Sequence, residues 1–259
     1  MALVIQSSSD SVAPRPAVLR VDGLSKHFGD KQAVVGLSCQ VNPGVIMGLI
    51  GPNGAGKTTT IKLILGLLLP SAGRAEVSGL DCTSESLRVR ELVGYVPDEP
   101  AFYEFLSGRE TLDFACEIRG LDRHSAWDRL EALSARLEFS QDLDQLVGGY
   151  SHGMKKKLAL LLALAHAPRL LLLDEPTNGL DPPSARLVRE LLSSQVADGV
   201  GILLSTHLLE MADRVCHSLM FLNKGHLIAA GTPLELRGRA GLGTDASLED
   251  AFLRLITAP

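Results

Sequence analysis

The chain has 259 residues, of which 46% are hydrophobic and 21% charged, and it is long enough to bury a sizeable core. This balance excludes collagen-like, coiled-coil and disordered proteins. The formal net charge of −5 disfavours binding of nucleic acid through bulk positive charge, so we expect no nucleic-acid partner.

The first part of the chain is dominated by strand patterns. Residues 1–16 are rich in serine and proline, which is typical of a flexible tail. Apolar and polar residues alternate from Ala17, and further elements follow: strands near 33–41, 45–50, 73–78 and 93–96, and helices over 57–66 and 84–92. We expect residues 17–97 to form an antiparallel β region and the first part of a parallel α/β core.

The middle of the chain is helical in pattern. No strand signal of any strength occurs between Ala101 and Ala165. Apolar side chains recur at helical spacing at four positions, Trp127, Leu130, Leu133 and Leu137, and we expect this face to pack in a core. Residues 98–165 are therefore predicted to form a helical subdomain.

Strands and helices alternate again towards the end of the chain. Apolar strands are predicted at 170–173, 202–204, 219–222 and 226–230, with helices at 183–197 and 208–215. Continuous apolar strands separated by helices are typical of a parallel sheet covered on both faces. We expect residues 166–231 to complete the α/β core and residues 232–259 to form C-terminal helices.

A phosphate-binding pattern lies between the strand at 45–50 and the helix at 57–66. Gly51-Pro52-Asn53-Gly54-Ala55-Gly56-Lys57-Thr58 fits G-x-x-x-x-G-K-[ST], and we predict that this loop and Thr59 bind the phosphates of a nucleotide. Its glycines let backbone N–H groups converge on an anion, and the helix start adds its positive dipole end. Lys57 is suited to the β- and γ-phosphates, and Thr58 offers a hydroxyl to Mg²⁺.

Two adjacent carboxylates follow the apolar strand Leu170–Leu173. Burying Asp174 and Glu175 there is costly unless a cation lies nearby. We predict that Asp174 holds Mg²⁺, directly or through water, and that Glu175 polarises the water that attacks the γ-phosphate. An Asn-Lys-x-Asp guanine reader is lacking, since Asn223-Lys224 is followed by Gly225-His226, which disfavours GTP.

With these motifs and their order, the sequence from about Ala17 to Gly231 resembles the nucleotide-binding subunit of an ATP-binding cassette (ABC) transporter. Five further segments carry the resemblance: Lys26-His27-Phe28-Gly29, Gly94-Tyr95-Val96-Pro97-Asp98, Tyr150-Ser151-His152-Gly153-Met154, Gly179-Leu180-Asp181-Pro182 and Ser205-Thr206-His207. The resemblance implies a P-loop NTPase core with a parallel sheet, an antiparallel β subdomain and a helical subdomain.

The resemblance also implies roles for single residues. Phe28 would stack on adenine. Asp98 would contact the nucleotide and Mg²⁺, Asp181 would contact the nucleotide, and His207 would contact the γ-phosphate and orient Glu175. The catalytic set is then Glu175, His207 and Lys57.

The second anion site implied by the resemblance lies at the start of a helix. Ser151 and Gly153 would offer a hydroxyl and free N–H groups to the γ-phosphate bound by another subunit. Two ATP molecules would thus be sandwiched in a head-to-tail dimer.

Several residues depart from the family's pattern. Asp98 stands where Gln or Glu is usual, and Glu99 stays open as an alternative for its role. His152 and Met154 replace a glycine and a glutamine, so we expect strain at His152 if that position needs a positive φ. Lys155-Lys156-Lys157 is expected to form a solvated face, with attraction of the partner's triphosphate as the alternative.

The function implied by the resemblance is an ATPase subunit that drives a membrane permease. Two segments resemble those of export-type bacterial cassettes: residues 150–155, a variant of the family's signature motif, and the loop of residues 96–100. The longest apolar run, Leu158–Ala165, is far below the roughly 20 residues of a spanning helix, so we expect the permease to be a separate chain that docks near Asp98 to Glu104. Scattered cysteines and the lack of a signal peptide favour a cytoplasmic location on the inner face of the membrane. A soluble cassette ATPase of repair or translation, or a regulatory nucleotide-binding module, stays open as an alternative.

Overall fold

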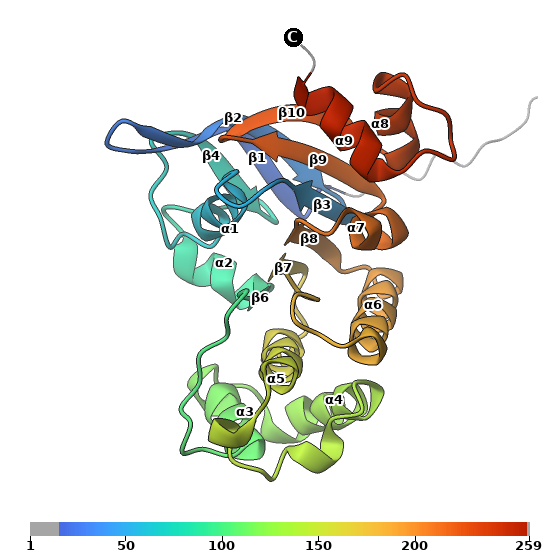
Figure 1. Cartoon of the computed structure of the whole chain (residues 1–259). Helices are drawn as coiled ribbons and strands as arrows, with labels where there is room; N and C mark the ends of the chain where they lie inside the picture. The colour runs from blue at the N-terminus through green and yellow to red at the C-terminus, as the bar shows by residue number, and fades with distance from the viewer. Residues whose placement is uncertain (1–15, 258–259) are drawn as a thin grey trace, which may run out of the picture.

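The computed structural model describes residues 16–257, so the tail predicted for residues 1–16 lies, apart from Pro16, outside the described residues (Figure 1). A four-stranded antiparallel sheet has the order β2-β1-β4-β5. Its strands are β1 (Leu19–Phe28), β2 (Lys31–Val41), β4 (Ala72–Val77) and β5 (Leu80–Asp81). The antiparallel β region predicted in the first part of the chain is confirmed.

A six-stranded sheet forms the centre of the molecule, with the order β10-β9-β3-β8-β7-β6. Neighbours from β9 to β6 run parallel, and only β10 is antiparallel to its neighbour. Its strands are β3 (Ile46–Ile50), β6 (Val93–Val96), β7 (Leu170–Asp174), β8 (Gly201–Thr206), β9 (Ser218–Asn223) and β10 (His226–Gly231). Every residue of β7 and β8 is buried, as expected for central strands that are covered on both faces.

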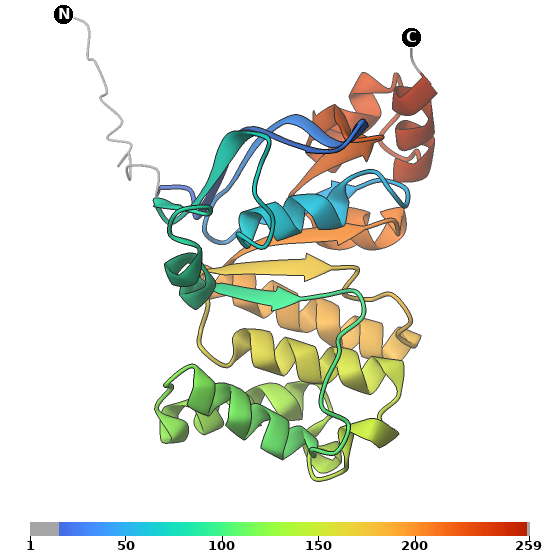
Figure 2. The same cartoon turned by 90° about the vertical axis from the view of Figure 1, so that its left-hand side faces the viewer.

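Helices cover this sheet, and further helices lie at both ends of the molecule. Six of them belong to the core and the C-terminal end: α1 (Lys57–Ile64), α2 (Ser86–Leu92), α6 (Pro182–Ala197), α7 (Leu209–Val215), α8 (Pro233–Arg239) and α9 (Leu248–Thr257). The others, α3 (Gly108–Ile118), α4 (Arg123–Arg136) and α5 (His152–Leu164), gather at one end of the molecule, with α5 nearest the sheet (Figure 2). Among residues 16–257 we find no helix with the length and apolar content to cross a bilayer.

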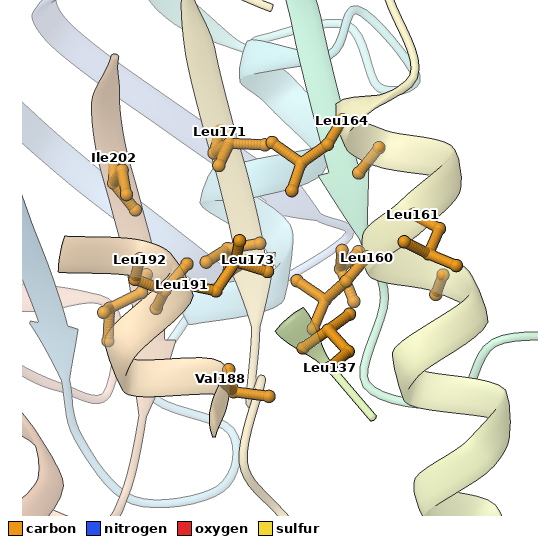
Figure 3. Packing of buried hydrophobic residues seen from close by; sticks show 14 of the residues in the cluster. Leu137, Leu160, Leu161, Leu164, Leu171, Leu173, Val188, Leu191, Leu192 and Ile202 are labelled. Atoms are coloured by element: carbon orange, nitrogen blue, oxygen red, sulfur yellow. The ribbon is translucent and has the colours of Figure 1, made fainter. Parts of the chain in front are cut away.

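The two faces of the parallel sheet belong to different apolar cores, because neighbouring residues of a strand point to opposite faces. Leu171 and Leu173 of β7 pack with helices α5 and α6, whereas Leu170 and Leu172 pack with α1 and the antiparallel sheet. Figure 3 shows leucines of α5 and α6 pointing towards β7 from two sides. The predicted helical stripe joins the first core through buried Leu130, Leu133 and Leu137 and partly buried Trp127, as expected.

Candidate nucleotide-binding site

The phosphate loop connects β3 to α1, and two of its glycines, Gly51 and Gly56, lie where no Cβ would fit. A Cβ at Gly51 would lie 2.3 Å from the carbonyl oxygen of Leu222, and one at Gly56 would lie 2.3 Å from that of Ala33. Gly56 also has φ 106°, a value that L side chains rarely adopt. Among the described residues no side chain caps α1, so its first N–H groups are available to an anion.

Lys57 extends along the inside of this loop. Its Nζ donates to the carbonyl oxygen of Gly51 at 2.7 Å and lies 3.5 Å from Oε1 of Glu175. The side chain is only 6% exposed. A buried ammonium needs negative partners, and the oxygens of a phosphate group suit it as well as a carboxylate does.

Asp174 ends β7 with its carboxylate held by two hydroxyl groups. Thr58 donates from Oγ1 to Oδ2 at 2.7 Å, and Ser205 of the adjacent β8 donates from Oγ to Oδ1. These hard oxygen ligands fit Mg²⁺, which proteins commonly bind through one or two carboxylates plus substrate phosphates. Residues 16–257 contain no group of three or more His, Cys, Asp or Glu side chains that could hold a metal ion.

Glu175 follows in an unusual backbone conformation. Its φ of 48° lies in the left-handed region, which costs a non-glycine residue about 1–2 kcal/mol. Oε1 lies 3.0 Å from Nδ1 of His207, and Oε2 accepts a hydrogen bond from the His207 N–H at 3.3 Å. Oε1 is buried yet receives no well-aligned hydrogen bond from the described residues, so it has capacity left for a water molecule.

A cavity of about 200 Å³ unites most of the predicted site residues. It is lined by Phe28, Asn53, Gly54, Ala55, Gly56, Lys57, Thr58, Thr59, Asp98, Asp174 and Glu175. The ring of Phe28 is 47% exposed and so has room to stack on a base. A larger cavity, of about 510 Å³, is lined in part by His207 and Leu180 and by none of the phosphate-loop residues.

Lys31 and Ala33 also line the nucleotide cavity, and the sequence analysis missed both. Lys31 is the cross-strand partner of Phe28, because β1 and β2 form a hairpin around Gly29-Asp30. A two-residue turn between strands is a recognisable hairpin signal, and it would have placed Lys31 beside Phe28.

The residues predicted for the second anion site lie elsewhere. Ser151 is the N-cap of α5 and accepts a hydrogen bond from Met154 N at 3.3 Å, and Asp181 is the N-cap of α6. Hydrogen bonds from the side chain and the backbone of Ser184 hold the pKa of Asp181 below its usual value. Neither Ser151 nor Asp181 lines the nucleotide cavity of its own chain.

The strain expected at His152 is not found. His152 begins α5 and is absent from the non-glycine residues with positive φ in the described chain. Its ring instead packs against Gly179, where an added Cβ would lie 2.8 Å from Cδ2 of His152. An imidazole therefore fits this signature position without a left-handed backbone.

The solvated face expected for the three lysines is wrong for Lys156, which is 0% exposed. Its Nζ donates to the carbonyl oxygen of Glu175 and lies 3.2 Å from Oδ1 of Asp98. Burial lowers the pKa of Lys156, while its hydrogen bond and charge interaction with Asp98 act in the opposite direction. Lys155 does meet the expectation, since it is partly exposed and only 3.4 Å from Oε1 of exposed Glu104.

Asp98 rather than Glu99 lines the cavity in the loop that follows β6. Its Oδ1 accepts from Nζ of Lys156 and, at 3.3 Å, from Nδ2 of Asn178. The side chain is 42% exposed and remains accessible from the cavity. The structure thus favours Asp98 for the loop role that the sequence left open between these two carboxylates.

The fold and this cavity define an ATPase built on a P-loop core. The ABC transporter family model matches residues 34–178. The chain is 39% identical to a daunorubicin resistance ATP-binding protein, DrrA3, of Streptomyces coeruleorubidus over 86% of this chain and 71% of that protein. It is 41% identical to the Nod factor export ATP-binding protein I of Burkholderia pseudomallei over 86% of this chain and 72% of that protein.

Solved structures agree with these matches. An ATP-binding subunit of an ABC transporter superimposes with a TM-score of 0.87 at 34% identity, covering 93% of this chain and all of that one. CbiO1 of Clostridium perfringens, part of the ABC transporter complex cbiONQ, gives a TM-score of 0.76 at 26% identity over 86% and 91% of the two chains. The chain belongs to the ABC transporter family as an ATP-binding subunit with ATPase activity, and its predicted fold class is confirmed.

Proposed function

We propose that this ATPase subunit drives export through a membrane permease formed by another polypeptide. The convergence of Lys57, Asp174 and Glu175 on one cavity beside the Phe28 ring carries the proposal. This arrangement combines a phosphate cradle, a metal position, a general base and an aromatic face. Export is supported by the relatives named for drug resistance and for Nod factor export.

The chemistry proposed for the cavity follows from the contacts of these side chains. Lys57 places its positive charge on the β- and γ-phosphates, and the Glu175 carboxylate takes a proton from the attacking water. His207 holds the Glu175 carboxylate from its ring and its backbone N–H. Bound Mg²⁺ would neutralise phosphate charge, held by Thr58, Asp174 and Asp98.

A dimer is part of the proposal, either of two copies or of this chain with another cassette subunit. Ser151 and Gly153 lie at the start of α5 and are outside the cavity of their own chain. A serine hydroxyl and unpaired N–H groups at a helix start suit the γ-phosphate held by a partner. ATP would then be bound between two subunits, and its hydrolysis would weaken the dimer interface.

The permease is proposed to dock on the helical subdomain of residues 98–165. An apolar cavity of about 420 Å³ there is lined by Ala101, Phe102, Tyr103, Thr111, Phe114, Ala115 and Leu162. Exposed aromatic rings surround it, since Tyr103 is 58%, Phe105 74% and Phe114 45% exposed. Such a cluster suits an apolar helix of a partner, and it supports a cytoplasmic position against the inner face of the membrane.

Hydrolysis and dimerisation are tested together with purified protein. Glu175→Gln should lower kcat by about 10²–10⁴-fold while ATP still binds and brings two subunits together. Lys57→Ala should weaken ATP binding in a calorimetric titration. Unchanged turnover in the first variant or unchanged affinity in the second would contradict the assigned roles.

Docking is tested by affinity purification of the tagged chain from detergent-solubilised native membranes. We expect a protein with several membrane spans to co-purify, and Phe114→Glu to abolish this because a carboxylate would face the apolar cavity. Leu87→Glu is the control, since Leu87 is 74% exposed on α2 and lies outside that cavity. Equal recovery with Phe114→Glu and the wild type would refute docking at this surface.

A further inference from the structure

Lys156 is a buried cation with partners in two separate loops. It lies in the second turn of α5, and its side chain is 0% exposed. Its ammonium group donates to the backbone carbonyl of Glu175 after β7 and lies 3.2 Å from Oδ1 of Asp98 after β6. A charge buried this deeply is costly, so its position depends on both partners.

The backbone of Glu175 depends on hydrogen bonds to keep its left-handed conformation. Its N–H donates to the carbonyl oxygen of Ser205 at 3.0 Å, and its own carbonyl accepts from Asn178 N–H at 3.2 Å and from Lys156. Lys156 is the charged donor of this set, and charge-assisted hydrogen bonds are stronger than neutral ones. It therefore contributes directly to the conformation that presents the Glu175 carboxylate to Lys57 and His207.

Asp98 is held by the same ammonium group. Its Oδ1 accepts from both Lys156 and Asn178, whereas its Oδ2 accepts no hydrogen bond from the described residues. Lys156 thus fixes one carboxylate oxygen of a residue that lines the nucleotide cavity and leaves the other available.

We propose that Lys156 is a positioning residue for ATP hydrolysis, which ties the backbone of Glu175 and the carboxylate of Asp98 to α5. This inference rests on the proposed roles of Glu175 and Asp98. Lys156 does not line the nucleotide cavity, so it makes no contact of its own with ATP and acts through these two residues. Its loss should therefore lower kcat more than it raises the dissociation constant of ATP.

Three variants separate positioning from a purely structural role. Lys156→Met keeps the length and removes the donor, and Lys156→Arg keeps the charge. Lys155→Met removes the same charge one residue earlier, from a partly exposed side chain that is paired, among the residues the structure describes, only with exposed Glu104. Steady-state ATPase kinetics, titration with a fluorescent ATP analogue and thermal unfolding are measured for each purified protein.

We expect Lys156→Met to lower kcat by about 10–100-fold, the scale of effect that a small misplacement of a catalytic group causes, with analogue affinity within about threefold of wild type. Lys156→Arg should recover part of kcat, and Lys155→Met should stay within about twofold of wild type. Asp98→Asn combined with Lys156→Met should cost less than the product of the single effects, because the two side chains share one contact.

The proposal is overturned if folded Lys156→Met retains the wild-type kcat, or if it loses analogue affinity as much as turnover. If Lys156→Met does not fold, Lys156→Gln takes its place, since its uncharged amide is one bond shorter and cannot make both contacts of the ammonium group, so kcat should still fall. Lys156→Gln with wild-type kcat would then be the contradicting result. A wild-type chain without ATPase activity would refute the proposed function instead, so the two failures are distinguishable.

Discussion

Ser151→Ala separates the cap of α5 from the proposed contact with a second subunit. Among residues 16–257 of one chain, the hydroxyl accepts a single hydrogen bond, 3.3 Å long, from Met154 N. Loss of such a cap costs about 0.5–1 kcal/mol, or a few degrees in melting temperature for a chain of this size. ATP binding to one subunit should not change, because Ser151 does not line the nucleotide cavity.

The dimer should respond much more strongly. A symmetric dimer loses two hydroxyl–phosphate hydrogen bonds, each worth about 1.5–3 kcal/mol when one partner is charged. The loss of about 3–6 kcal/mol weakens association by about 10²–10⁴-fold. We would measure the dissociation constant of the ATP-dependent dimer by analytical ultracentrifugation in the Glu175→Gln background, in which slow hydrolysis leaves the dimer associated.

Ser107→Ala is the matched control for this experiment. Ser107 is the N-cap of α3 in the same subdomain, where it accepts from Glu110 N at 3.1 Å and forms a capping box. Its replacement should lower stability at least as much as Ser151→Ala but leave the dimer intact. Equal dimer affinity in the two serine variants would refute the reasoning.

Three further predictions concern the cavity and stability. Gly56→Ala should abolish ATP binding in calorimetry, because the new Cβ would lie 2.3 Å from the Ala33 carbonyl oxygen; retained affinity contradicts the loop geometry. Phe28→Ala should weaken ATP binding by about 1–3 kcal/mol, whereas Phe28→Tyr should not, and equal affinities would exclude stacking. Burial lowers the pKa of His166 from 6.5 to about 4, so only the unfolded chain binds its proton between these values and stability falls with falling pH. Between pH 7 and pH 5, the free energy of unfolding measured in urea should fall by about 1–2 kcal/mol less in His166→Gln than in the wild type, after allowance for partial solvent contact. An equal fall in both proteins would contradict the pKa shift.

The order of elements could be predicted because local patterns determine it. Leu170–Leu173 is apolar throughout since both faces of β7 are covered, and it is followed by Asp174, whose carboxylate meets Thr58 at the same edge of the sheet. The phosphate loop was recognisable because its glycines, lysine and flanking strand and helix are contiguous in sequence.

The burial of Lys156 could not be predicted in the same way. A lysine in the first turns of a helix is usually exposed, and only the tertiary structure shows that the loops after β6 and β7 converge on its ammonium group. The roles of Ser151, Gly153 and Asp181 stay predictions for a related reason. Their proposed ligand belongs to another chain, and no pattern within a single sequence encodes how two chains meet.

One apolar core continues from α4 through α5 to β7, and this has a mechanical consequence. Leu130, Leu160 and Leu173 belong to a single buried cluster, and close-packed interiors resist compression. If the proposed permease presses on the aromatic rings beside α3, we therefore expect α5 to move as a rigid body rather than to bend. The displacement would then reach the end of β7, which carries Asp174.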